Sequence, residues 1–380
     1  MDLEVIERIH VSMRDVFANS GTAYRIGLKA KRLIEESTDE IRKSLQIPSS
    51  HRIIFTSGGT ESNNLFIKGL CFPDKKSAYL GLEHPSVVES LLFLMQFGNK
   101  PISLISFQKD GKLDFTSFEK LKEERVKFLF LSHVNNELGS IHDLQWVTTE
   151  LMRKSPQTRL FIDGVQAVGK IRLDKVDWEG IVGYSISGHK IHGPKGIGLL
   201  IYDSKLALNP QMHGGNQQFG VRSGTPPLPL IMGLETAIKN SVSRTDRTQE
   251  HIKKLSKYLI TGLRKLEEKN KNLEIRFNSN TGENKQSQSS GIINFSFPPV
   301  EGEVVLHHLE IKNIFVGLGS ACSAQSKEPS KILVGIGLSE EEARCSLRIS
   351  FSRQNSFEEI DQFLVAFEES YRTLYPTFIR

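Results

Sequence analysis

Short apolar runs alternate with longer amphipathic stretches in the first half of the chain, and this alternation constrains the fold more than any other feature. The runs lie near residues 53–56, 77–82, 102–105, 127–132, 159–162, 181–186 and 198–202. Strands that alternate with helices build a mostly parallel, doubly wound sheet. We therefore predict an α/β fold organised around such a sheet.

The pattern changes after about residue 240, where a long amphipathic helix is expected. Its apolar side is formed by Ile252, Leu255, Leu259, Leu263 and Leu266. A chain of 380 residues can bury a large core and should hold about two domains. We predict a large domain over residues 1–240 and a smaller α+β domain over residues 241–380, to which the N-terminal segment could also contribute.

The smaller domain contains three further recognisable segments. The polar segment 278–288 is predicted to be an exposed loop, and the apolar run 292–297 that follows it is predicted to be a strand. A last helix is expected from about Phe357 to Leu374. Its core-facing stripe is formed by Phe357, Ile360, Phe363, Leu364, Phe367 and Tyr371. Such a stripe indicates packing and not a binding site.

Polar side chains follow the predicted strands at the edge where open α/β sheets bind ligands. Lys190 comes after the run 181–186, and Ser187, Gly188 and His189 precede it. A lysine in this setting suits an imine with an aldehyde cofactor, of which pyridoxal phosphate is the obvious one. Most lysines lie on the surface without a chemical role, so the neighbouring motifs decide between the two interpretations.

A carboxylate and an amide end another predicted strand. Asp163 could face a pyridine nitrogen and keep it protonated, and Gln166 could donate to the phenolate oxygen of the ring. Asp163 could alternatively do no more than cap a helix. Asn136 also follows a predicted strand and could bond the same ring oxygen.

The segment from Ser57 to Asn64 joins a predicted strand to a helix. Gly59 and Thr60 lie where backbone amides and a hydroxyl would cradle a phosphate, although such loops often only turn the chain. His84 ends a further strand, where it could stack on the cofactor ring and move protons. A lone histidine at such a place is more often structural.

With these motifs the chain closely resembles the cysteine desulfurases, enzymes of aminotransferase class V that supply sulfur for iron–sulfur cluster assembly. The resemblance runs from about residue 4 to the C-terminus. It also rests on the segments Gly214–Thr225, Gly319–Ser323, Glu328–Ser330 and Ser346–Ser350. It implies fold type I of the pyridoxal phosphate enzymes, conversion of L-cysteine to L-alanine, and delivery of sulfur to an acceptor such as an iron–sulfur scaffold protein.

The resemblance also implies roles for individual residues. Lys190 would form the Schiff base, Asp163 would pair with the pyridinium, and His84 would be the stacked acid–base residue. Gln166 and Asn136 would bind the ring oxygen, and Asn136 would also contact substrate. Gly59, Thr60, Ser187 and His189 would hold the phosphate. Thr225 would reach the phosphate of the neighbouring subunit in a homodimer, and Arg348 would grip the substrate carboxylate by a two-pronged pair.

Cys322 is predicted to be the reactive cysteine. The resemblance implies that its thiolate takes sulfur from the substrate and holds it as a persulfide. Small and polar residues around it suit a moving loop, whereas Cys71 and Cys345 are expected to be small buried residues. Three scattered cysteines indicate a reducing compartment and not a disulfide framework.

Composition limits the other classes of function. The net charge of +5 arises from 49 basic and 44 acidic residues, which is too small and too dispersed to suggest nucleic-acid binding. No apolar run reaches the length needed to cross a bilayer, and the first residues do not form a signal-peptide pattern. We therefore expect a cytoplasmic protein without a metal site.

Some segments depart from the family pattern and keep alternatives open. Family members usually open with an Asp-Asn-Asn-Ala-Thr-Thr segment that lines the substrate pocket, whereas this chain begins near its first expected helix. The usual Asp-Ala-Ala-Gln motif reads Asp163-Gly164-Val165-Gln166 here. The alternatives are a catalytically weakened relative that acts as a cofactor-binding assembly partner, and another class V enzyme such as a selenocysteine lyase or an aminotransferase.

Overall fold

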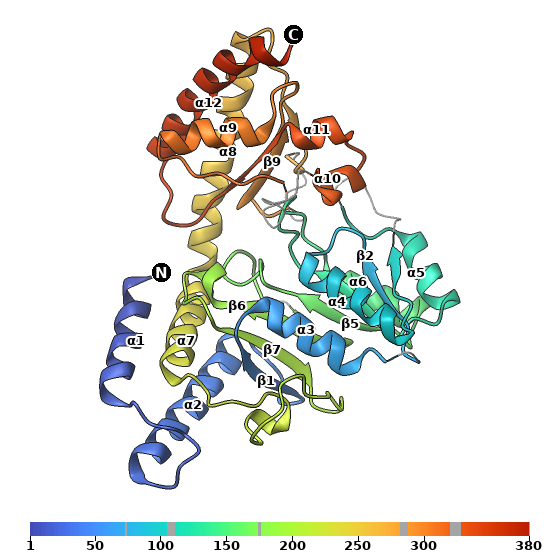
Figure 1. Cartoon of the computed structure of the whole chain (residues 1–380), viewed down its shortest axis with the longest axis vertical. Helices are drawn as coiled ribbons and strands as arrows, with labels where there is room; N and C mark the ends of the chain where they lie inside the picture. Colours follow the sequence, from blue (N-terminus) through green and yellow to red (C-terminus); the bar gives the residue numbers. More distant parts are fainter. Residues whose placement is uncertain (73, 105–110, 174–175, 282–287, 320–327, 380) are drawn as a thin grey trace. The chain divides into compact units, whose positions relative to one another are not determined.

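The computed structural model describes residues 1–379 except residues 73, 105–110, 174–175, 282–287 and 320–327 (Figure 1). The chain forms two compact units. Unit 1 comprises Met1–Leu104, Phe115–Val134 and Asp143–Thr245. Unit 2 comprises Ile105–Asp114, Asn135–His142 and Asp246–Arg380.

Unit 1 is built on a seven-stranded sheet with the strand order β1-β7-β6-β5-β4-β2-β3. Its strands are β1 His51–Thr56, β2 Ser77–Leu80, β3 Ile102–Leu104, β4 Phe128–Ser132, β5 Arg159–Asp163, β6 Ile181–Ser187 and β7 Gly198–Asp203. From β3 to β6 neighbouring strands pair in parallel, whereas β7 runs antiparallel to both β1 and β6. The predicted mostly parallel sheet is therefore confirmed, and each predicted run forms a strand.

Helices surround this sheet in unit 1. They are α1 Leu3–Asp15, α2 Arg25–Ser44, α3 Gly59–Leu70, α4 Pro85–Phe93, α5 Phe115–Glu123, α6 Leu144–Lys154 and α7 Leu228–Ser243, with the short 3-10 helices η1 Leu94–Phe97, η2 Gly188–Ile191 and η3 Gln218–Gly220. α3 packs against β6 and β7, and α1 and α2 pack against α7 (Figure 1). The loop from β1 into α3 and the turn from β6 into η2 are the connections that carry candidate site residues.

Aromatic rings fill the sheet surface beneath α3. The Phe66 ring of α3 lies with its centroid 4.4 Å from that of Phe161, and the Phe130 and Phe161 centroids are 5.4 Å apart. All three side chains are fully buried. Strands that are apolar along their whole length are typical of a parallel sheet covered by helices, because both of their faces are buried.

Unit 2 contains a three-stranded antiparallel sheet with the order β10-β9-β8. Its strands are β8 Arg276–Phe277, β9 Ile292–Ser296 and β10 Ser346–Ser350. Its helices are α8 Thr245–Lys269, α9 Gly302–Ile311, α10 Lys331–Gly335, α11 Glu340–Arg344 and α12 Phe357–Phe378. All five apolar residues of the predicted amphipathic helix lie in α8 and are buried in the core of this unit.

Two expectations about unit 2 are wrong. Phe357 is not in the core: 38% of it is exposed, because it begins α12, and its ring lies edge-on to the ring of Tyr258. The described part of segment 278–288 is not simply an exposed loop. Ser279 and Gln288 are buried, because both side chains donate to the carbonyl oxygen of Leu138, at 2.7 and 2.8 Å. Residues 282–287 lie outside the described part of the chain.

The other apolar residues of the predicted α12 stripe are buried or packed against the core. Cys71 and Cys345 are buried as expected, and burial raises the pKa of each thiol to about 12. No helix within the described residues is both long enough and apolar enough to span a membrane.

A glycine in the middle of β6 tests the packing of unit 1. A Cβ at Gly183 would lie 2.4 Å from Phe161 Cδ2 and 2.7 Å from Phe66 Cε2. We expect Gly183→Ala to lower the free energy of unfolding by about 1–3 kcal/mol, because the buried rings would have to move. Urea unfolding measures this change.

Gly291→Ala is the matched control, because Gly291 is also buried but its added Cβ would approach no atom closer than 3.6 Å. Equal losses in the two variants would contradict the proposed packing.

Candidate active site

Asp163 is the last residue of β5 and is buried. Its Oδ2 accepts a hydrogen bond of 2.8 Å from Asn63 Nδ2 in α3, and its Oδ1 accepts one of 3.1 Å from the backbone amide of Val165. A buried carboxylate is costly unless donors or positive charges compensate it. Each of its two oxygens therefore has a hydrogen-bond donor.

His84 lies between β2 and α4 and caps that helix. Its Nδ1 accepts a hydrogen bond of 3.1 Å from the backbone amide of Ser86, and Pro85 occupies the first helical position. Burial lowers the pKa of His84, the nearby charge of Asp163 raises it, and that of Lys190 lowers it again. The net shift is downward, so the neutral imidazole is favoured.

Lys190 lies in η2, directly after β6, and its side chain is exposed. Its charge acts on His84, on which Asp163 also acts. Hydrogen bonds through Asn63 and Ser86 also link Asp163 to His84, so these three predicted residues lie near one another within unit 1. Ser187, at the end of β6, is buried, and its Oγ lies 2.9 Å from His189 Nδ1. Partial burial and the charges of Lys190 and Lys195 lower the pKa of His189.

The predicted phosphate cradle lies beside these residues. α3 begins at Gly59, and a Cβ on the preceding Gly58 would lie 3.6 Å from Ser187 Oγ. A Cβ at Gly59 would lie 2.4 Å from Val165 Cγ2, so this close approach requires glycine. The exposed Thr60 follows in the first turn. The first amides of the helix and these hydroxyls therefore form a site of the kind that binds an anion.

Arg222 forms an ion pair with Glu61, in the first turn of α3 next to Thr60. Its Nε donates to Glu61 Oε1 at 2.9 Å, in a pair of which both side chains are mostly buried. Thr225 lies three residues further on and is exposed. Gln166, also predicted, accepts a hydrogen bond at its Oε1 from Lys170 Nζ, so its amide nitrogen is the group that could donate to a ligand.

The remaining predicted residues lie in unit 2 or outside the described chain. Arg348 in β10 donates from Nη1 to the backbone oxygen of Asn136 at 3.1 Å. Glu137, the next residue, is buried and accepts a 2.5 Å hydrogen bond from Ser330 Oγ. Burial raises the pKa of Glu137 to about 7 against the opposing effects of Ser330 and Arg348. Cys322 lies outside the described residues.

Sequence reasoning missed several buried residues around Asp163. Asn63 bonds Asp163 and also donates to Ser86 Oγ at 2.9 Å. Glu83 is fully buried, and Ser132 Oγ donates to its Oε1 at 3.3 Å. Asn63 and Glu83 were visible as polar residues beside apolar runs, but their partners are distant in the sequence, so no local pattern reveals them.

Tyr184 in β6 was also missed. It is buried beside Asp163, and its hydroxyl lies 2.8 Å from His133 Nδ1. Burial and the Asp163 charge raise the pKa of Tyr184, so the phenol stays neutral. A Cβ at Gly164 would lie 1.8 Å from Tyr184 Cε1. Glycine at position 164 therefore makes room for this ring.

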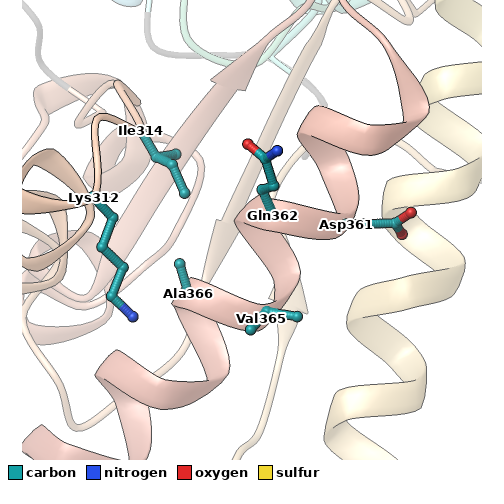
Figure 2. Close-up of a pocket in the computed structure, with 6 residues that line it drawn as sticks. All are labelled: Lys312, Ile314, Asp361, Gln362, Val365 and Ala366. Atoms are coloured by element: carbon teal, nitrogen blue, oxygen red, sulfur yellow. The ribbon is translucent and has the colours of Figure 1, made fainter.

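A separate hollow lies on unit 2, with a volume of about 460 Å³. Figure 2 shows Lys312, Ile314 and Gln362 around it, together with Asp361, Val365 and Ala366. None of the predicted site residues lines it. Among the described residues, no group of three or more histidine, cysteine, aspartate and glutamate side chains could hold a metal ion.

Comparison with known proteins adds independent findings. The sequence model of the family described as aminotransferase class-V matches residues 1–363. A protein named cysteine desulfurase IscS from Dictyoglomus turgidum is 32% identical over 382 residues, which cover 98% of this chain and 93% of that protein. One of the same name from Pseudoalteromonas translucida is 34% identical over 363 residues, covering 92% of this chain and 84% of that protein.

Solved structures similar to this chain cover nearly its whole length as well. A NifS-like protein from Rickettsia africae superposes with a TM-score of 0.84 at 29% identity, and the match covers 98% of this chain and 96% of that one. Another structure described as a NifS-like protein gives a TM-score of 0.87 at 27% identity, with 98% and 97% covered.

Glu83 gives the site a pH-dependent contribution to stability. Burial, with the nearby charge of Asp163, raises its pKa from 4.5 to about 8. Between these values the folded chain holds a proton that the unfolded chain has released, so this contribution is full below about pH 4.5 and is lost as the pH rises through about 8. We expect Glu83→Gln to remove a slope of up to about 1.4 kcal/mol per pH unit.

Urea unfolding of both proteins at several pH values across this range measures the difference. Glu89→Gln, an exposed glutamate of α4, is the control and should leave the slope unchanged. If the free energy of unfolding depends on pH equally in wild type and Glu83→Gln, Glu83 is not protonated in the folded chain.

Proposed function

Because the chain belongs to the aminotransferase class V family and is a cysteine desulfurase that uses pyridoxal phosphate, we propose that Lys190, His84, Arg348 and Cys322 carry its reaction. The family predicted from the sequence motifs is confirmed. The observation that most supports the residue assignment is the clustering of Lys190, His84 and the buried Asp163 in unit 1.

The residues of unit 1 suit the cofactor chemically. A phosphate would be held by the first amides of α3 with Thr60, Ser187 and His189, and Asp163 would hold a ring nitrogen in its protonated form. Gln166 would donate to the ring oxygen, and so would Asn136, although Asn136 belongs to unit 2. When bound, pyridoxal phosphate supplies an aldehyde that binds amines and a ring that withdraws electrons from the substrate. We propose that the predicted domain of residues 1–240 is the cofactor domain.

Arg348 would bind the substrate carboxylate. A guanidinium offers two parallel donors that match the two carboxylate oxygens. In unit 2, Nη1 of Arg348 also contacts the Asn136 carbonyl oxygen, which holds the side chain in one orientation. The nearby Glu137 has a raised pKa, so its protonated form does not compete for the guanidinium below about pH 7.

The Nζ of Lys190 would take the proton from the substrate α-carbon. His84 would be the stacked acid–base residue beside it. The thiolate Sγ of Cys322 would attack the substrate sulfur, forming a sulfur–sulfur bond and breaking the carbon–sulfur bond. The electron pair of the broken bond stays with carbon, which takes up a proton and becomes the methyl group of alanine. Cys322 then carries a persulfide, which an acceptor such as an iron–sulfur scaffold protein would receive.

Cys322→Ser tests this assignment. We expect alanine formation from L-cysteine with a thiol present to fall at least about a thousandfold, because a hydroxyl cannot act as a thiolate nucleophile here. Alanine and sulfide are assayed, and the absorbance of the bound cofactor should not change.

Cys345→Ala is the matched control, because this buried thiol, with a pKa raised to about 12, should be inert. A Cys322→Ser protein that still forms alanine would indicate a different class V reaction. A wild-type protein that binds cofactor but releases no alanine would favour the assembly-partner alternative.

We further propose a homodimer in which Thr225 contacts the phosphate bound by the neighbouring subunit. Thr225 is exposed in its own chain, and the segment that leads to it is tied to the cradle through the Arg222–Glu61 pair. Thr225→Ala should weaken cofactor binding about fivefold, the effect of one lost hydrogen bond, without dissociating the dimer.

Light scattering measures the mass, and a fluorescence titration of the cofactor-stripped protein measures affinity. Thr149→Ala, an exposed threonine in α6 whose hydroxyl bonds Gln145 of its own helix, should change neither quantity. A monomeric wild-type protein would rule the proposal out.

A further inference from the structure

The cap of α4 determines which nitrogen of His84 carries the proton. Pro85 at the first helical position has no amide hydrogen. The backbone amide of Ser86 is therefore the first N–H of the helix that can donate to the capping side chain. It donates to His84 Nδ1 at 3.1 Å. A ring nitrogen that accepts an N–H bond presents its lone pair, so the proton of the neutral ring lies on Nε2.

The Ser86 hydroxyl adds a second donor to the same nitrogen. Asn63 Nδ2 donates to Asp163 Oδ2 at 2.8 Å and to Ser86 Oγ at 2.9 Å, which uses both of its amide hydrogens. Ser86 Oγ is therefore an acceptor from Asn63, and its own hydrogen points to His84 Nδ1, 2.8 Å away. The direction of the whole chain of bonds follows from the charge of Asp163 at its far end.

The surroundings also disfavour an imidazolium at this place. His84 is mostly buried, it lies at the positive end of the α4 dipole, and Lys190 of η2 adds a further positive charge. Asp163 at the end of β5 acts in the opposite direction. Glu83, next to His84 in the chain, has a pKa raised to about 8 and so adds little charge at neutral pH.

We infer that Ser86 is a positioning residue that, together with the cap of α4, keeps His84 neutral with its proton on Nε2. The consequence for the reaction rests on the role proposed above for His84. A ring held in this form donates a hydrogen bond from Nε2 and cannot take a proton there, so general-base work falls to Lys190. Asn63 connects Asp163 with Ser86, because its Nδ2 donates to both residues.

Nitrogen NMR of the full-length, cofactor-loaded protein tests the inference directly. With histidine labelled with ¹⁵N, the His84 signals are assigned by their loss in His84→Gln. The wild type should show Nε2 protonated and Nδ1 unprotonated at neutral pH. In Ser86→Ala the midpoint of His84 protonation should move to higher pH, because the neutral ring loses a donor.

The pH profile of alanine formation should follow the same shift. On the acid side of the profile, Ser86→Ala should lose about fivefold in kcat/KM, the effect of one lost hydrogen bond, and recover at higher pH. Ser86→Thr keeps the hydroxyl and should restore the wild-type midpoint. Ser90→Ala removes another buried hydroxyl of α4, which bonds the Ser86 carbonyl at 2.7 Å, and should leave the midpoint unchanged.

A wild-type spectrum with the proton on Nδ1, or equal midpoints in wild type and Ser86→Ala, would overturn the inference. If Ser86→Ala does not fold, the wild-type spectrum alone still decides the tautomer. The NMR result does not depend on sulfur release. A protein with the expected tautomer but no desulfurase activity would therefore contradict the proposed function and leave this inference intact.

Discussion

The parallel register of β4, β5 and β6 is the constraint on which the arrangement of unit 1 depends. Ser132 pairs with Asp163, and Asp163 pairs with Ser185, so the ends of these strands reach one edge of the sheet together. Because successive strands are parallel, each chain segment that leaves this edge starts with a polar residue at nearly the same level. Residues distant in sequence thereby become neighbours without any long loop.

Burial at this edge makes each polar group depend on its partner. Asp163 accepts hydrogen bonds from Asn63 and from the backbone amide of Val165. Burial outweighs the hydrogen bonds that Glu83 receives from Ser132, raises the pKa of Glu83 and favours its protonated form. Tyr184 remains a neutral phenol beside the same carboxylate. Of these neighbouring acids, Asp163 is therefore the one suited to hold a negative charge, which is what a carboxylate facing a pyridinium needs.

Much of this organisation is predictable from sequence, because apolar strands and the residues that end them are local features. All seven strands of the large sheet, and Asp163, His84 and Lys190 at or near strand ends, follow from such patterns. The roles of Asn63 and Ser86 do not follow from them. Asn63 bonds Ser86, 23 positions away, and Asp163, 100 positions away, and these contacts form only when the chain folds. Gln288 was misjudged for the same reason, since the carbonyl that buries it is 150 positions away.

The close fit of Tyr184 against Gly164 has a consequence for how such a chain can evolve. The methyl group of an alanine at position 164 would collide with the ring, whereas glycine opposite a smaller side chain leaves only a small void. A lineage that exchanges one pair for the other therefore passes through glycine opposite the smaller side chain, since tyrosine opposite alanine would be a barrier. Where the tyrosine was gained, the change to glycine should accordingly have come first, although the two positions lie twenty apart in the sequence.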